Sequence, residues 1–498
     1  MNHRLVFRYL GYFVLSMVLW LALSSLWCFW YREWAALAAF GKSILATVAL
    51  GAGLVLLGLR APKRMYERES IALVGLGWLI TAGVGALPFW FAGMMPFADA
   101  YFESMSGFTT TGSSVIPVLE PVAKSILFWR ALTHWLGGLG IVLLIVAILP
   151  IIGIRGKMLC RSEATGIDKD GLRPRIKDTA VILYKIYTGL TVIQITLLMA
   201  AGMDFFDASC HTFAALATGG FSTRTMSVAA YDSVPIEIII NVFQLLGATN
   251  FALYYAMAKG NWRSMFRDTE WRVFMGIYAC TVLMVTLNLL GAQGAVAVDT
   301  STPGAMGAFD YSAPQALRHA SFEVSTMMTN TGFFSADMNL WPYFSRILIL
   351  VVVMMGGCAG STAGGMKIIR VIILFKIATQ QLKRTFRPHT IHAIRVDGKI
   401  ISEDVQYSVL SFFLVYVSFF TFATLVMSLL GLPLQTAFSS VVACLNNTGP
   451  GLELVGPVAN FQFIPAVGKY FLSLVMVTGR LEFFSILVFF LPSFWKRG

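Results

Sequence analysis

The sequence has few charged residues for its length. Only 12% of the 498 residues are Asp, Glu, Lys or Arg, about half the usual share of a soluble protein, whereas 57% are hydrophobic. A water-soluble chain of this size has no means of burying so much apolar surface. The composition therefore excludes a soluble protein, a disordered chain and a coiled coil, and it indicates a polytopic membrane protein.

Cysteines and catalytic motifs are equally sparse. The six cysteines lie far apart and form no CxxC or Cys/His pattern, which excludes a disulfide scaffold and a zinc site. The sequence has no HExxH, GxSxG or Walker A motif, and no apolar run carries paired carboxylates. We therefore expect no catalytic residue, no cofactor bound by this chain and no enzyme activity.

Ten apolar runs are long enough to cross a bilayer, which takes about 20 residues per helix. They cover residues 9–30, 37–59, 71–93, 125–153, 179–202, 234–258, 273–294, 342–366, 405–431 and 466–492. If these spans alternate from a cytoplasmic N-terminus, six short segments holding 27 of the 37 Lys and Arg residues face the cytoplasm. The positive-inside rule then predicts that both termini are cytoplasmic. The net charge of +12 does not indicate a nucleic-acid partner, because these basic residues form no exposed domain.

Four connections on the opposite side contain an apolar segment too short to cross the membrane. They are residues 97–115, 205–222, 317–335 and 434–451. Each ends in polar, glycine-containing sequence, which is typical of a short helix with an irregular return at membrane depth. Aligned on one glycine each, the segments share an alanine twelve residues earlier, and the glycines are 108, 112 and 117 residues apart. The unit of span, short helix, glycine loop and span therefore occurs four times.

The aligned loops supply the candidate ion-binding residues. They are Thr110, Thr111 and Gly112; Thr218, Gly219 and Gly220; Asn330, Thr331 and Gly332; and Asn447, Thr448 and Gly449. Glycine beside Thr or Asn permits a left-handed backbone that turns carbonyl oxygens toward one axis. Rings of such carbonyls replace the water shell of a cation in a selectivity filter. Carboxylates are missing from these positions, which favours a monovalent cation. Glu103 and Glu323 are expected behind the filter.

A competing interpretation is that these glycines merely end short helices or let helices pack closely. One such loop alone would favour it. Four loops in register, all on one side of the membrane, favour a common pore instead.

The eighth and tenth spans contain unusual residues inside the membrane. The eighth holds a cluster of small residues, Gly356, Gly357, Gly360, Ser361, Gly364 and Gly365. Each glycine costs a helix about 1 kcal/mol relative to Ala, so we expect a broken segment facing the pore. The alternative is a GxxxGxxxG packing face on an intact helix.

Polar residues elsewhere in the spans have competing interpretations. Arg480 in the last span is either a charge barrier on the pore axis or a structural ion pair, for example with Glu482. Arg130 and His134 are predicted to be interfacial anchors. Gln244 and Asn250 either line the pore or bond between helices.

These motifs resemble the Trk/Ktr/HKT potassium-uptake superfamily, and most of all its bacterial TrkH-type subunits. The resemblance rests on the four loops, on GGCAGSTAGGMK at 356–367 and on TGRLEF at 478–483. The extra hairpin 9–59 is similar to TrkH-type rather than shorter Ktr-type subunits. The resemblance implies an all-α membrane protein with four M1–P–M2 repeats in pseudo-four-fold arrangement, located in the bacterial inner membrane. It identifies the twelve loop residues as the potassium site, and it places segment 356–367 and Arg480 below them as the gate.

The resemblance also implies partners and divisions of the chain. The partners are a second copy of the chain, the lipid bilayer and a cytoplasmic nucleotide-binding ring of the TrkA type, with no nucleic acid. The divisions are 1–69 for the hairpin and 70–178, 179–272, 273–404 and 405–498 for the repeats. The outer connection 296–316 has no role that we can assign.

The expected function is channel-like potassium uptake, with potassium as the transported ion. Related plant members that carry sodium have Ser at the first-loop glycine, so Gly112 favours potassium. The alternatives are transport of sodium or another monovalent cation by the same fold, and a membrane-embedded enzyme.

Overall fold

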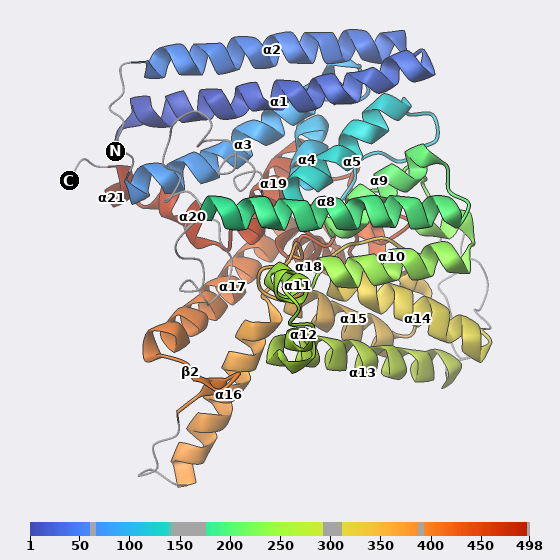
Figure 1. Cartoon of the computed structure of the whole chain (residues 1–498), viewed down its shortest axis with the longest axis vertical. Helices are drawn as coiled ribbons and strands as arrows, with labels where there is room; N and C mark the ends of the chain where they lie inside the picture. The colour runs from blue at the N-terminus through green and yellow to red at the C-terminus, as the bar shows by residue number, and fades with distance from the viewer. Residues whose placement is uncertain (60–65, 139, 141–175, 292–310, 387–392, 496–498) are drawn as a thin grey trace.

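The computed structural model describes the chain apart from residues 60–65, 139, 141–175, 292–310, 387–392 and 496–498. The described part is almost entirely helical. Its one sheet is a small antiparallel hairpin of β1 (Arg395–Val396) and β2 (Lys399–Ile400). Long helices lie side by side across Figure 1, with both termini at the left. The predicted all-α architecture is confirmed.

An N-terminal helical hairpin lies at one edge of the molecule. It consists of α1 (His3–Tyr31) and α2 (Trp34–Gly58). Gly11 and Gly51 face each other where the two helices touch, so their backbones approach closely. The opposite face of α2 exposes Leu45 and Leu56, which suits contact with lipid tails rather than water.

Four long helices each lead into a short helix. The pairs are α3 (Glu67–Phe91) with α4 (Phe97–Phe108), α8 (Ile176–Ala200) with α9 (Phe205–Leu216), α13 (Thr269–Gly291) with α14 (Ala313–Met328), and α17 (Glu403–Leu429) with α18 (Leu434–Leu445). The members of each pair pack against each other. The alanine twelve residues before each loop glycine is fully buried, so a small side chain stands where the short helix meets its neighbours. These helices have 12 to 16 residues, too few to cross a bilayer, which confirms the four predicted half-helices.

The helices that follow the four loops are short or broken. They are α5 (Lys124–Gly138), α10 (Val234–Gly247) with α11 (Phe251–Ala258), α15 (Tyr343–Met355) with α16 (Ile368–Phe386), and α19 (Ala466–Arg480) with α20 (Phe484–Leu487). The chain bends by 94° between α10 and α11. The predicted spans 234–258 and 466–492 are therefore interrupted, which the sequence did not indicate, whereas the break within 342–366 is the expected one. Most of the predicted span 125–153 beyond α5 lies outside the described residues.

The breaks lie beside close backbone contacts. A β-carbon on Gly137, Gly247 or Gly479 would crowd the last helical carbonyls of α4, α9 and α18 respectively. The return helix ends at that glycine or one residue after it in α10, α19 and the described part of α5. These three return helices therefore cross the carbonyl ends of their half-helices so closely that only glycine fits at the contact.

Six helices of the described part are long and apolar enough to span a membrane, and the bent pair α10 and α11 makes a seventh. The remaining short elements are α12 (Arg263–Arg267), α21 (Pro492–Trp495), and the 3₁₀ turns η2 (Ser227–Tyr231), η3 (Met338–Leu340), η4 (Glu453–Val455) and η5 (Val488–Phe490).

Candidate functional site

The four predicted loops share an unusual backbone. The Thr or Asn two residues before each glycine has φ between 53° and 58°, and the glycine has φ between 79° and 96°. The residues are Thr110 and Gly112, Thr218 and Gly220, Asn330 and Gly332, and Asn447 and Gly449. A left-handed conformation costs a non-glycine residue roughly 1–2 kcal/mol. Strain at four equivalent positions indicates a loop geometry that the protein requires.

The loops close into a ring around one axis. Each loop glycine lies against the next loop. A β-carbon added to it would crowd the carbonyl oxygen of the residue that directly precedes the glycine of that next loop. The pairs are Gly112 with Gly219, Gly220 with Thr331, Gly332 with Thr448, and Gly449 with Thr111. The fourth contact returns to the first loop, so the structure brings the predicted site residues of all four loops together.

Side-chain hydrogen bonds join the loops unequally. Asn330 Nδ2 donates to Thr448 Oγ1 at 2.7 Å, which links the third loop to the fourth. Asn447 Nδ2 donates to Thr111 Oγ1 at 2.9 Å, which links the fourth loop to the first. In the second loop the Thr218 hydroxyl instead faces the Thr362 hydroxyl of segment 356–367, at 3.4 Å. The ring therefore has four-fold backbone contacts but a lower symmetry in its side chains.

Glu103 and Glu323 lie behind the ring, as expected. Both are fully buried, and each binds backbone amides of the segment that directly follows its own loop. Glu103 Oε2 accepts from the Val115 amide at 2.9 Å. Glu323 Oε1 accepts from the Ser335 amide at 2.7 Å and from the Ala336 amide at 3.1 Å. These carboxylates fix the loops from outside and leave the axis to backbone groups.

Arg130 and His134 also support the ring, so their prediction as interfacial anchors is wrong. Arg130 is buried and its Nε donates to Glu103 Oε1 at 2.6 Å. The Arg130 guanidinium lies over the Phe221 ring at 3.5 Å from the centroid. His134 Nδ1 lies 2.7 Å from the Gly107 carbonyl oxygen. Both side chains point from α5 into the contact between the first two loops rather than toward the membrane surface.

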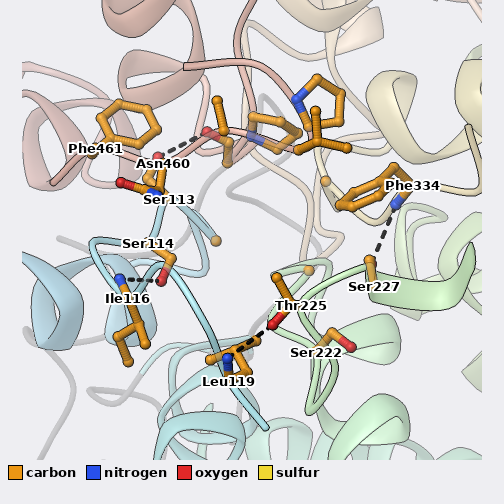
Figure 2. A pocket seen from close by; sticks show the side chains of 18 of the residues that line it. Ser113, Ser114, Ile116, Leu119, Ser222, Thr225, Ser227, Phe334, Asn460 and Phe461 are labelled. Carbon is orange, nitrogen blue, oxygen red and sulfur yellow. Dashed lines mark hydrogen bonds between the residues drawn. The ribbon is translucent and has the colours of Figure 1, made fainter. Parts of the chain in front are cut away.

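A bowl opens on one side of the ring. All four loop glycines line it, together with Arg130 and segments after each loop. Hydrogen bonds tie neighbouring repeats around it, including the Leu119 amide to Thr225 Oγ1 at 2.9 Å (Figure 2). At the rim, hydrogen bonds from Thr225 lower the pKa of the Glu120 carboxyl. The bowl gives solvent a route to the ring.

Segment 356–367 lies against the other side of the ring. The chain leaves helical geometry at Gly356, where φ is 72°, so the prediction of a broken segment is confirmed against an intact packing helix. A β-carbon on Gly364 would crowd the carbonyl of Asn446, directly before the fourth loop. The segment fills the bend between α10 and α11: Cys358 N donates to Ala248 O at 2.9 Å, and Thr362 N to Gly247 O at 3.1 Å.

Arg480 connects this segment to the first repeat. Its guanidinium donates to Thr362 O at 2.7 Å, to Gly137 O at 2.7 Å and to Gly138 O at 2.8 Å. Glu482, its suggested partner, forms an ion pair with Arg370 of α16. Three carbonyl oxygens from two other repeats thus hold the cation beneath the ring.

Gln244 and Asn250 bond between or within helices. Gln244 Nε2 is hydrogen-bonded to Ser325 Oγ of α14. Asn250 Oδ1 accepts from Ala252 N at 2.9 Å and caps α11. Sequence reasoning missed Thr362, whose hydroxyl lies within hydrogen-bond distance of Gly247 O, at 2.8 Å, and of Leu216 O, at 3.0 Å. Its position inside the glycine cluster was the available signal.

The fold and the ring define a class: a membrane protein in which four re-entrant loops of one chain surround a common axis. Residues 37–497 match the family model of TrkH, described as a cation transport protein. The chain therefore belongs to the TrkH family, and the family description confirms the prediction of a transporter rather than an enzyme.

Relatives with a known name are similar in sequence to this chain over most or all of its length. The Trk system potassium uptake protein TrkH of Escherichia coli K12 is 37% identical over 501 residues, covering 100% of both chains. The protein TrkG of the same strain is 32% identical and covers 87% of this chain and 86% of its own. The crystal structure of the potassium transporter TrkH from Vibrio parahaemolyticus is 34% identical, covers 100% of both chains and has a TM-score of 0.87.

The buried ion pair behind the first loop yields a stability prediction. Glu103→Gln keeps one acceptor oxygen, which can serve Ser114 or Val115 but not both, and it leaves the Arg130 charge buried without its carboxylate. We expect a loss of about 3–5 kcal/mol in the free energy of unfolding, seen as a lower thermal midpoint of the purified protein in detergent.

The control for this substitution is Glu120→Gln, which removes an exposed carboxylate at the rim. It should leave the thermal midpoint near the wild-type value. Equal midpoints for the two variants would show that the Glu103–Arg130 pair does not stabilise the loop.

Proposed function

We propose that this protein takes up potassium across the bacterial inner membrane through the ring of loops. The observation that carries the proposal is the closed ring, in which four glycines each face a carbonyl of the next loop. Backbone carbonyls at one axis replace the water shell of a monovalent cation without needing a carboxylate. Relatives named as potassium uptake proteins support potassium as the ion.

Helix electrostatics support a cation in this position. The half-helices α4, α9, α14 and α18 all end two residues before the left-handed Thr or Asn of their loop. Their carbonyl ends therefore converge on the ring, and the C-terminal end of a helix carries partial negative charge. Four such ends favour a cation beneath the filter.

We propose that segment 356–367 and Arg480 form the gate. The segment packs against the inner side of the ring, and Arg480 bridges it to α5. A half-buried guanidinium beneath the ring repels a cation, and the three carbonyl contacts hold the segment in place. Opening requires that these contacts be exchanged for others.

The proposed orientation has both termini in the cytoplasm, with a second copy of the chain and a soluble nucleotide-binding ring as partners. The distribution of Lys and Arg supports this orientation. The connections on the proposed cytoplasmic side are too short to hold a nucleotide-binding domain, so nucleotide control needs a separate protein.

Gly112→Ser tests the filter. The new side chain would crowd the carbonyl of Gly219 and break the ring. We expect rubidium or potassium uptake to fall at least about tenfold, which corresponds to about 1.4 kcal/mol, and the preference over sodium to decrease. The measurement is ion uptake in a host stripped of its own potassium systems, normalised to protein in the membrane.

Gly93→Ser is the matched control. Gly93 is also left-handed, with φ 69°, but a β-carbon there meets open space. It carries the same backbone strain without touching the ring, so its uptake should match wild type. If Gly112→Ser transported ions as Gly93→Ser does, the filter assignment would be wrong.

Arg480→Ala tests the gate. The substitution removes the positive charge and the ties to Thr362 and α5, so we expect uptake to rise roughly tenfold, with the potassium-to-sodium ratio little changed. Arg480→Lys separates the two causes. It keeps the charge but cannot bridge three carbonyls, so low uptake would identify the charge as the barrier and high uptake would identify the ties. Unchanged flux in Arg480→Ala contradicts a gating role.

The partner proposal has a direct test. Purification of the native complex from membranes should bring down a soluble nucleotide-binding protein, and cross-linking should trap two copies of this chain. Recovery of a lone monomer under mild detergent conditions would contradict both partners.

A further inference from the structure

A buried glutamate outside the ring contacts the proposed gate segment. Glu270 is the second residue of α13, yet its side chain is only 6% exposed. It points from the start of that helix toward the base of segment 356–367. A carboxylate buried inside a membrane protein is costly unless it is well bonded, so its partners indicate what it does.

One oxygen of Glu270 binds the backbone at two places, one within the gate segment and one just after it. Glu270 Oε1 accepts from the Ala359 amide at 2.8 Å and from the Ile369 amide at 3.0 Å. Ala359 lies in the segment, and Ile369 is the second residue of α16, just after it. The carboxylate therefore joins two backbone positions ten residues apart, as a clamp across the base of the loop.

Backbone hydrogen bonds close the same base. Ile368 N donates to Gly357 O at 3.0 Å, and Met366 N donates to Met354 O at 3.2 Å. Neutral backbone bonds are weaker than bonds to a carboxylate. Glu270 is therefore the strongest of these ties across the base.

The position of Glu270 is in turn fixed by the β hairpin. Asp397, in the turn between β1 and β2, accepts from the Thr269 amide at 3.0 Å and also from the Thr269 hydroxyl. This contact caps the first turn of α13, directly before Glu270. Along the chain, the gate segment leads into α16 and α16 leads to the hairpin. The hairpin binds the start of α13 through Asp397, and α13 binds the gate segment through Glu270, so these elements form a closed circuit.

We propose that Glu270 is a positioning residue that holds segment 356–367 closed beneath the ring, with Asp397 setting its place from the hairpin. The inference rests on the proposed gate. When the carboxylate is removed, two amides beside it lose a charged acceptor in the closed conformation. A conformation in which the segment moves and these amides meet water is then favoured.

The test compares Glu270→Ala with Glu270→Gln. The glutamine oxygen can still accept both amide hydrogen bonds, whereas alanine cannot. We expect Glu270→Ala to raise rubidium uptake on the order of tenfold, with the potassium-to-sodium ratio unchanged because the ring is untouched. Glu270→Gln keeps both hydrogen bonds but loses the charge, so its uptake should lie between the wild-type rate and that of Glu270→Ala.

Glu237→Ala is the matched control for the loss of a buried glutamate. Glu237 is 4% exposed on α10 and pairs with Arg318 of α14, away from the gate segment. Uptake per folded protein should stay at the wild-type rate. If Glu237→Ala raised uptake as much as Glu270→Ala, general destabilisation would explain both and the inference would be overturned.

Asp397→Ala tests the same circuit at an exposed position, where folding is not at risk. It should raise uptake in the same direction as Glu270→Ala, by a smaller factor. The inference is overturned if Glu270→Ala and Asp397→Ala both show wild-type uptake, or if Glu270→Ala and Glu270→Gln change uptake equally. If Arg480→Ala raised uptake although Glu270→Ala did not, the proposed gate would stand without a role for Glu270. If Gly112→Ser left uptake unchanged, the proposed filter assignment would be wrong.

Discussion

Contact between one backbone and another, permitted by glycine, is the constraint on which the rest of this structure depends. Around the ring, each loop glycine faces a carbonyl oxygen of the next loop. One level below, Gly137, Gly247 and Gly479 face the last carbonyls of three half-helices. A methyl group at any of these positions would push the repeats apart, because packed interiors have no spare volume. Backbone rather than side chains therefore surrounds the axis, and carbonyl oxygens are available to an ion.

The buried charges act around this glycine framework rather than within it. Glu103 and Arg130 hold the first two loops from outside, and Glu323 holds the third. Beneath the ring, Arg480 and Glu270 both bind backbone groups of the proposed gate, segment 356–367. Charged side chains thus fix backbone positions at every level through charge-assisted hydrogen bonds, which are stronger than neutral ones.

Much of this could be predicted from the sequence because it is local. The four half-helices and their loops follow from apolar runs, one glycine and a Thr or Asn at a fixed offset. The breaks in the return helices could not be predicted, since apolar composition continues through 234–258 and 466–492 while the cause is a contact with another repeat. The buried position of Arg130 could not be predicted for the same reason. Its partner Glu103 stands 27 residues earlier, and a charge near the end of an apolar run is indistinguishable from an anchor without that contact.

A single chain with four unequal repeats allows one feature that four identical subunits do not. The positions directly after the close-contact glycines are Gly138, Ala248 and Arg480. One arginine fits beneath the ring because its counterparts are small and Gly138 offers a carbonyl to it. Four arginines at this level would repel one another at short range in a medium of low dielectric. They would also compete for the carbonyls that now bind one guanidinium. Fusion of the repeats therefore permits a single charge beneath a ring that keeps nearly four-fold backbone symmetry, as the proposed barrier requires.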